Sequence, residues 1–137
     1  MDKAQMEDAL KRVVVPVLRD RAFKGSWPHF RRHSGSRLHL LSFQFDKYGG
    51  GFIVEISHCA GEGITTSWGQ KIPPNKLDVS YRPPKERLRL GTGPMVHDYW
   101  FRYDEASTAS TGEDLCKQVL ELLDAQAEPW WQSAEIQ

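Results

Sequence analysis

The stretch SFQFDKYGGGFIVEISH, residues 42–58, predicts two antiparallel strands joined by a glycine-rich bend. Apolar and polar side chains alternate on both sides of DKYGGG, as they do in strands with one buried face. The glycines permit the positive φ angles that a tight turn requires. A phosphate-binding loop would need Lys and Ser or Thr after the glycines and then a helix, whereas this chain continues with the strand-like FIVEIS. We therefore expect the bend only to turn the chain.

The same alternation predicts how three neighbouring strands pair. We place these strands at residues 27–33, 38–45 and 52–58, joined by the links HSGSR and DKYGGG. Both links put large apolar side chains opposite one another on a single face, which we call the phenylalanine face. The facing pairs are Phe30–Leu41, Leu41–Ile56, Phe43–Val54 and Phe45–Phe52. Because the two registers agree without adjustment, we expect this face to be buried.

Two amphipathic helices are predicted, one at each end of the chain. The first should be kinked or locally broken at Pro16, which lacks a backbone N–H, and should end near residues 22–23. The second opens with Ser110 and Glu113 spaced as a capping box. Pro129 should stop it, so that the two tryptophans that follow pack back onto the body. The apolar stripes consist of Met6, Leu10, Val13, Val14, Val17 and Leu18 in the first helix and Leu115, Cys116, Val119, Leu122 and Leu123 in the second.

These elements predict an α+β fold. We expect an antiparallel sheet of about four to five strands, with the kinked N-terminal helix and the C-terminal helix packed on the phenylalanine face. Residues 60–97 are rich in Gly and Pro and should form an ordered loop with one short strand near residues 87–90. The segment DYWFRYD alternates well enough to be a further strand. A length of 137 residues predicts a single domain, residues 1–137.

The two registers gather polar side chains on the opposite side of the sheet, which we call the reverse face. His29, Ser42 and Glu55 fall in one row across the three strands. A glutamate in the middle of a strand is disfavoured unless its face is wet or it has a partner. We therefore expect a contact surface there for a protein partner or small ligand, with a solvated or helix-covered face as the alternative. The candidate binding residues are Trp27, His29, Arg31, Ser42, Gln44 and Glu55.

The same row does not predict catalysis. A serine–histidine–acid relay requires the histidine to touch both other groups, but here the serine stands in the middle. His29 and Glu55 are still close enough to pair above the small Ser42. We therefore assign no catalytic residue, and a small hydrolase-like enzyme that uses this cluster is an alternative function.

Charge is unevenly distributed along a chain whose net charge is zero. Residues 1–103 hold 17 Lys and Arg against 10 Asp and Glu, and residues 104–137 hold 1 against 8. Basic side chains near tryptophans can bind single-stranded nucleic acid, which is a second alternative function. The competing interpretation is that the acidic C-terminal helix lies against the basic body. The basic residues concerned are Arg31, Arg32, Arg82, Lys85, Arg87 and Arg89, with Trp27 and Trp68 nearby in the sequence.

The composition and the spacing of particular residues argue against a disulfide, a membrane span and a metal site. Cys59 and Cys116 lie far apart in the sequence, which favours free thiols over a disulfide. No apolar run approaches the roughly 20 residues that a membrane span needs, and the charged start MDKAQMEDALKR has no apolar signal region, so we expect a cytoplasmic protein. His29 and His33 are too far apart on a strand to share a metal ion. No metal and no cofactor is therefore expected.

Four segments, VVVPVLRDRAFKGSWPHFRRH, LLSFQFDKYGGGFIVEIS, WGQKIPPNK and RLRLG, carry a family resemblance. Over residues 8–104 the chain resembles a bacterial family of domains of unknown function, the one numbered 4304. Its features are a proline-bearing helix, Phe-Lys before a strand, and the strand that leads into the glycine bend. Ala22 departs from the Gly expected before Phe23. The resemblance implies no activity and no site residue. We therefore expect a non-enzymatic binding or interaction module of a bacterial cytoplasm, of an immunity-like or regulatory kind.

Overall fold

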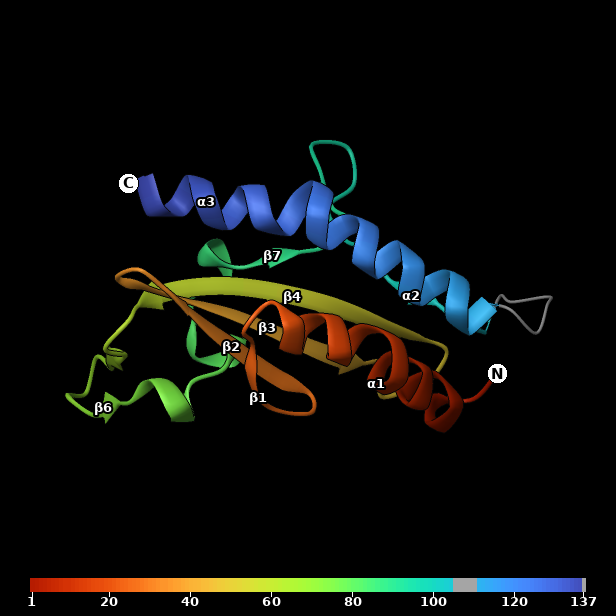
Figure 1. Ribbon diagram of the computed structural model, residues 1–137, viewed down its shortest axis with the longest axis horizontal. Helices are drawn as coiled ribbons and strands as arrows, with labels where there is room; N and C mark the ends of the chain where they lie inside the picture. The colour runs from red at the N-terminus through yellow and green to blue at the C-terminus, as the bar shows by residue number, and fades with distance from the viewer. Residues whose placement is uncertain (105–110, 137) are drawn as a thin grey trace.

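An antiparallel sheet forms the centre of the molecule (Figure 1). The computed structural model describes residues 1–104 and 111–136. Six of the described strands pair in the order β1-β2-β3-β4-β7, with β8 also paired to β4, while β5 and β6 form a small separate sheet. The predicted α+β class is confirmed, with six strands in the main sheet in place of the expected four to five.

In the described part of the chain, one helix precedes the strands and two helices follow them. The strands are β1 (Lys24–Ser26), β2 (His29–Ser34), β3 (Arg37–Phe45), β4 (Gly51–Ala60), β5 (Ile64–Thr65), β6 (Lys71–Ile72), β7 (Leu88–Arg89) and β8 (Phe101–Arg102). The helices are α1 (Lys3–Asp20), α2 (Thr111–Leu122) and α3 (Glu128–Ile136). Three 3-10 turns, η1 (Pro74–Lys76), η2 (Val79–Tyr81) and η3 (Pro84–Glu86), precede β7, and a π-helical turn, η4 (Leu123–Ala127), joins α2 to α3.

The predicted register of the three long strands is confirmed. The pairs Phe30–Leu41, Leu41–Ile56, Phe43–Val54 and Phe45–Phe52 all lie opposite one another. Helices from both ends of the chain cover the phenylalanine face, as predicted, because their apolar stripes join its side chains in one core cluster. Among the described residues, none of the helices combines the length and the hydrophobicity that crossing a membrane requires.

Pro16 lies inside α1 and Pro129 lies inside α3. Helix α1 continues through Pro16 without the local break, while a kink there stays a prediction. The prediction that Pro129 stops the C-terminal helix is wrong, because α3 runs on to Ile136. The π-helical turn η4 lies directly before Pro129 and resets the hydrogen-bond pattern, so the proline falls in the first turn of α3, where its missing N–H costs little. The predicted capping residue Ser110 lies outside the described residues.

The segment after β4 folds back over part of the reverse face. Leu38 and Leu40 on β3 and Cys59 on β4 form a second apolar cluster with residues of this segment, namely Ile72, Leu77 and Val79. The hydroxyl of Ser57 donates to the carbonyl of Glu86 at 2.8 Å, which fixes the end of the cover. The predicted strand near residues 87–90 is present as β7. Cys59 and Cys116 are buried free thiols in separate clusters, as their separation predicted.

Helix α1 ends in a left-handed cap at Ala22. The N–H of Phe23 donates to Leu18 at 2.9 Å and the N–H of Ala22 donates to Arg19 at 3.0 Å, the hydrogen-bond pattern of a Schellman motif. Ala22 has a φ of 72°, a conformation in which its Cβ crowds the backbone. This is the position at which the family pattern predicts Gly.

The left-handed cap predicts that a substitution at Ala22 can stabilise the protein. We expect Ala22→Gly to raise the free energy of unfolding by roughly 0.5–1 kcal/mol, because glycine has no Cβ to strain in this conformation. Urea unfolding followed by circular dichroism measures the change. Ala4→Gly, in the exposed first turn of α1, is the matched control and should lower stability by roughly 0.5–1 kcal/mol. Equal destabilisation by both substitutions would contradict the assignment of strain to Ala22.

Candidate functional site

The polar row on the reverse face is assembled as predicted, but its members form two separate groups. His29, Ser42 and Glu55 lie opposite one another on β2, β3 and β4. The ring Nδ1 of His29 lies 2.8 Å from the hydroxyl of Ser42. The carboxylate of Glu55 turns instead to Arg87 and Arg89, at 3.6 and 3.5 Å. The predicted meeting of His29 and Glu55 is therefore replaced by ion pairs to the β7 side of the sheet.

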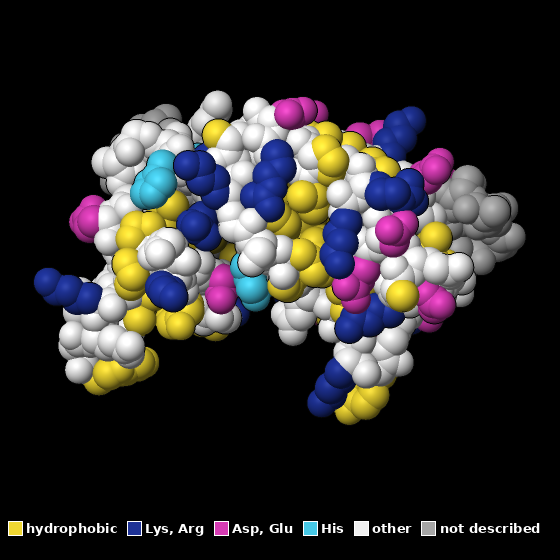
Figure 2. Space-filling view, turned by 60° about the horizontal axis from the view of Figure 1, so that its bottom comes forward, with side chains coloured by type: hydrophobic (Ala, Val, Ile, Leu, Met, Phe, Trp, Pro, Cys, Tyr) yellow, Lys and Arg dark blue, Asp and Glu magenta, His cyan; other side chains and the backbone are white. Residues whose placement is uncertain are grey.

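A hollow of about 560 Å³ opens beside this row and reaches round the end of β3. We call it the edge hollow. Its walls include Trp27, His29, Ser42, Gln44, Phe45 and Glu55. The segment that covers the reverse face supplies another wall through Val79, Ser80 and Arg87. The His29 end of the row stays accessible, because the side chain of His29 is 48% exposed. Figure 2 shows this side of the molecule as a concave face between two projecting lobes, with apolar surface near its centre and Lys and Arg side chains around it.

Five of the six predicted site residues line the edge hollow, and one of the five, Trp27, differs from its predicted place. Trp27 was expected beside Gln44 on the reverse face, but its ring stacks on Phe43 at 4.8 Å and its indole donates to Glu7 at 3.2 Å. The reason is that β2 begins only at His29, so strand alternation does not extend back to Trp27. Arg31 lies opposite Leu40 as predicted, but outside the walls of the hollow.

A carboxylate that the sequence did not reveal faces His29 from the other side. Asp78, which caps η2 by accepting from the N–H of Ser80 at 2.8 Å, places its second oxygen 4.0 Å from Nε2 of His29. His29 therefore lies between the hydroxyl of Ser42 and the carboxylate of Asp78. Glu55 could not form this arrangement, because Ser42 lies between it and His29. Asp78 lies in the segment whose path alternation cannot predict, and the only local signal was its Asp-Val-Ser capping sequence.

This arrangement can hold a proton between Ser42 and His29, but the serine is poorly placed for attack. Ser42 is only 7% exposed, and its register puts its own N–H in the ladder with β4, where it cannot stabilise an oxyanion. The described residues contain no group of three or more His, Cys, Asp or Glu side chains placed to hold a metal ion. The chemistry that the site offers most directly is hydrogen bonding and ring contact.

Most arginines of the predicted nucleic-acid surface are engaged by carboxylates. The ion pairs are Arg32–Glu128, Arg82–Glu86, Arg87–Glu55, Arg89–Glu55 and Arg89–Asp98. Burial alone would raise the pKa of Asp98, but hydrogen bonds from Arg89 and Trp100 hold it below its ordinary value. A phosphate backbone would have to displace these carboxylates. The competing interpretation, an acidic C-terminal helix against a basic body, agrees with the pair between Arg32 and Glu128.

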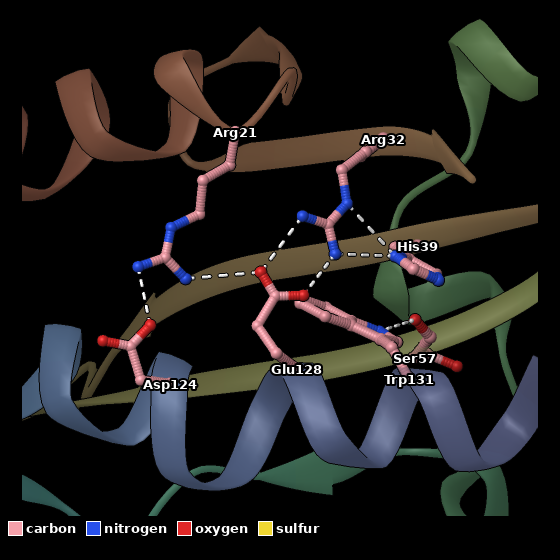
Figure 3. A network of polar contacts seen from close by, with 7 residues as sticks. All are labelled: Arg21, Arg32, His39, Ser57, Asp124, Glu128 and Trp131. Carbon is pink, nitrogen blue, oxygen red and sulfur yellow. Dashed lines mark hydrogen bonds and ion pairs between the residues drawn. The ribbon is translucent and has the colours of Figure 1, made fainter.

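A second polar cluster, which sequence reasoning missed, joins that helix to the phenylalanine face of the sheet (Figure 3). Glu128 accepts from Arg32 at 2.6 Å and from Arg21 at 3.3 Å, while Arg32 also reaches Nδ1 of His39 at 2.9 Å. Partial burial alone would raise the pKa of Glu128, but the two arginines outweigh it and hold the pKa below its ordinary value. We call this cluster the α3 network. It consists of Arg21, Arg32, His39, Ser57, Asp124, Glu128 and Trp131.

Comparison with known proteins bears on family and not on activity. A family model described as a domain of unknown function, DUF4304, matches residues 14–133, which is most of the chain. No curated protein and no solved structure matches this sequence. The match spans α1 from Val14, the whole sheet, and the C-terminal helix as far as Ser133. The chain therefore belongs to the DUF4304 family of domains of unknown function.

Proposed function

We propose that this chain is a cytoplasmic, non-enzymatic binding module that takes a protein partner or small ligand in the edge hollow. The observation that supports this most is the make-up of the hollow. Trp27 and Phe45 give it an aromatic wall, and His29 and Gln44 give it polar groups. A concave site with an apolar wall and a few converging polar groups is the usual form of a ligand site.

The charged groups of the hollow are arranged in a way that suits recognition. Glu55 is held by two arginines, and Glu7 accepts from the indole of Trp27 and pairs with Lys3 at 3.7 Å. Side chains that are already held in place lose less freedom when a ligand binds. A partner therefore meets a largely prearranged surface.

The test introduces a charge into the hollow without touching the core. Gln44 is exposed and lines the hollow, and Gln132, exposed on α3, is the matched control. We expect Gln44→Glu to weaken binding at least tenfold and Gln132→Glu to leave it unchanged, with both variants as stable as the wild type. The measurement is an NMR titration of ¹⁵N-labelled protein with pools of small-molecule fragments and, separately, of random peptides. Ligands that bind both variants equally well would place the binding surface elsewhere.

One observation favours a hydrolase-like enzyme as the second candidate. His29 lies between the hydroxyl of Ser42 and the carboxylate of Asp78, at 2.8 and 4.0 Å. If Ser42 is a nucleophile, a fluorophosphonate probe should label it covalently, and mass spectrometry should find the adduct on the peptide that contains Ser42. His29→Gln should abolish the labelling, because the serine would lose its base. Wild-type protein that stays unlabelled would remove this candidate.

A further inference from the structure

The edge of β3 is open at one end of the edge hollow. The pairing of β2 with β3 stops at His29–Ser42, whereas β3 continues to Phe45. The N–H of Phe43 still donates to the carbonyl of Pro28 at 3.0 Å. In an antiparallel ladder the two residues would exchange a second hydrogen bond, but proline has no N–H to give. The carbonyl of Phe43 is therefore left without its ladder donor.

The next backbone groups along this edge also point outward. The N–H of Asp46 donates to Gly51 on β4, so strand alternation turns the N–H and carbonyl of Phe45 to the opposite side, away from β4. No described residue outside the ladder donates to that carbonyl or accepts from that N–H. The edge hollow is lined by Phe43, Gln44 and Phe45 in succession. Consecutive residues point to opposite faces, so the strand edge itself must form part of the wall.

We propose that this edge accepts an extended, acidic peptide segment of a partner protein as an added strand. The proposal rests on the function proposed above and names the class of ligand. Pro28 already lies opposite Phe43, so an added strand supplies main-chain partners to the open N–H and carbonyl of Phe45. Its alternate side chains fall on the two sides of the edge. One side offers the ring of Trp27, and the other offers His29 and Gln44.

The charge of the partner follows from two lysines outside the walls of the hollow, Lys11 beside the wall residue Trp27 and Lys47 two residues after Phe45. Lys11 lies over the ring of Trp27 at 5.5 Å, and Lys47 lies over the ring of Tyr48 at 5.0 Å. Neither lysine forms an ion pair with a carboxylate in the described part of the chain. The acidic groups of the hollow, Glu7 and Glu55, are both already paired. An incoming carboxylate therefore meets cations that lack an acidic partner, whereas an incoming lysine or arginine would not find a free acid on these walls.

The first test asks whether peptides bind through their main chain. A phage library of random twelve-residue peptides is panned against the wild-type protein, and peptides lost on Gln44→Glu are kept, because an added carboxylate repels an acidic peptide. We expect acidic sequences. Each kept peptide is then made with a single N-methyl group at every position in turn. Strand addition predicts at least a tenfold loss of affinity at one position, or at two positions separated by one residue, and less than a threefold change at their neighbours.

The second test removes the donor on the protein. Phe45→Pro deletes the outward N–H, and Phe45→Ala removes the same ring but keeps the N–H. We expect the proline variant to bind a kept peptide at least tenfold more weakly than the alanine variant. Thermal unfolding of both variants shows whether they are folded. If Phe45→Pro does not fold, the N-methyl scan on wild-type protein alone decides whether the peptide binds as an added strand.

The remaining outcomes separate this proposal from the one on which it rests. Peptides that depend on Gln44 but tolerate N-methylation everywhere would overturn strand addition and leave the binding function standing. Basic peptides in place of acidic ones, or no peptide that depends on Gln44, would also overturn it. A concentration-dependent dimer, measured by light scattering and lost in Phe45→Pro but kept in Phe45→Ala, would make a second copy of this chain the occupant and overturn the partner proposed here.

Discussion

Replacing Trp131 with alanine is expected to lower the free energy of unfolding by about 3–5 kcal/mol. The indole is completely buried, and its ring stacks parallel to His39 at 4.8 Å. Its N–H donates to the carbonyl of Ser57 at 2.9 Å, so the side chain ties α3 to β4 as well as filling the core. Truncation leaves a cavity and removes one hydrogen bond to the carbonyl of Ser57, and both effects lower the free energy of unfolding. Urea unfolding followed by circular dichroism at 222 nm measures the loss.

Two matched variants separate the contributions of the Trp131 side chain. Trp131→Phe keeps a ring but removes the N–H, and should cost about 1–2 kcal/mol through the carbonyl of Ser57. Trp130→Ala removes the neighbouring, partly exposed ring beside His58, and should cost less than half as much as Trp131→Ala. A loss below about 1.5 kcal/mol for Trp131→Ala would show that α3 is not anchored through this residue.

The sequence predicts the central sheet because its register depends on a local property. Alternation in the three long strands carries the pairing of Phe43 with Val54 and the row from His29 to Glu55. That information lies within residues 29–58 and needs no long-range contact. Alternation fails for Trp27, which lies two residues before the start of β2, where the chain is not in the strand and the period of two does not apply.

The rest of the site depends on contacts between distant segments, which periodicity does not report. Asp78 reaches His29 only because the segment after β4 folds over the reverse face. Glu128 meets Arg32 although 96 residues separate them in the sequence. The opposite charges of the two ends of the chain indicated that a basic body and an acidic helix could attract each other. They did not indicate which arginine pairs with which carboxylate, because that choice is made by packing.

The largest electrostatic effect is expected at the centre of the α3 network. Arg32 is 14% exposed and has Glu128, itself 26% exposed, as its carboxylate partner. Glu128→Gln leaves the guanidinium with the rings of Phe23 and Trp131 and with His39, but without the opposite charge. Removing one partner of a largely buried pair costs more than the pair itself contributes. We expect a loss of roughly 2–4 kcal/mol at pH 7, reduced from the fully buried case because water reaches the carboxylate.

The pH dependence of this loss identifies its origin. The pKa of Glu128 in the folded protein lies below its ordinary value, since the attraction of Arg32 and Arg21 outweighs the effect of burial. Its stabilising contribution is therefore complete above the ordinary glutamate pKa of about 4.3 and is lost as the pH falls through the lower pKa of the folded state. The stability difference between wild type and Glu128→Gln should be constant from pH 8 to about pH 5.5 and shrink below that.

A matched carboxylate one turn earlier shows whether burial decides the size of the effect. Asp124 pairs with Arg21 at 2.7 Å, but its side chain is 67% exposed. Asp124→Asn should cost no more than about 0.5–1 kcal/mol, and 0.5 M salt should remove most of that, because water and ions screen an exposed pair. The loss for Glu128→Gln should persist in the same salt. If the two substitutions cost the same, or if the difference for Glu128→Gln is unchanged at pH 3, then α3 is held by apolar packing and the buried charge pair contributes nothing.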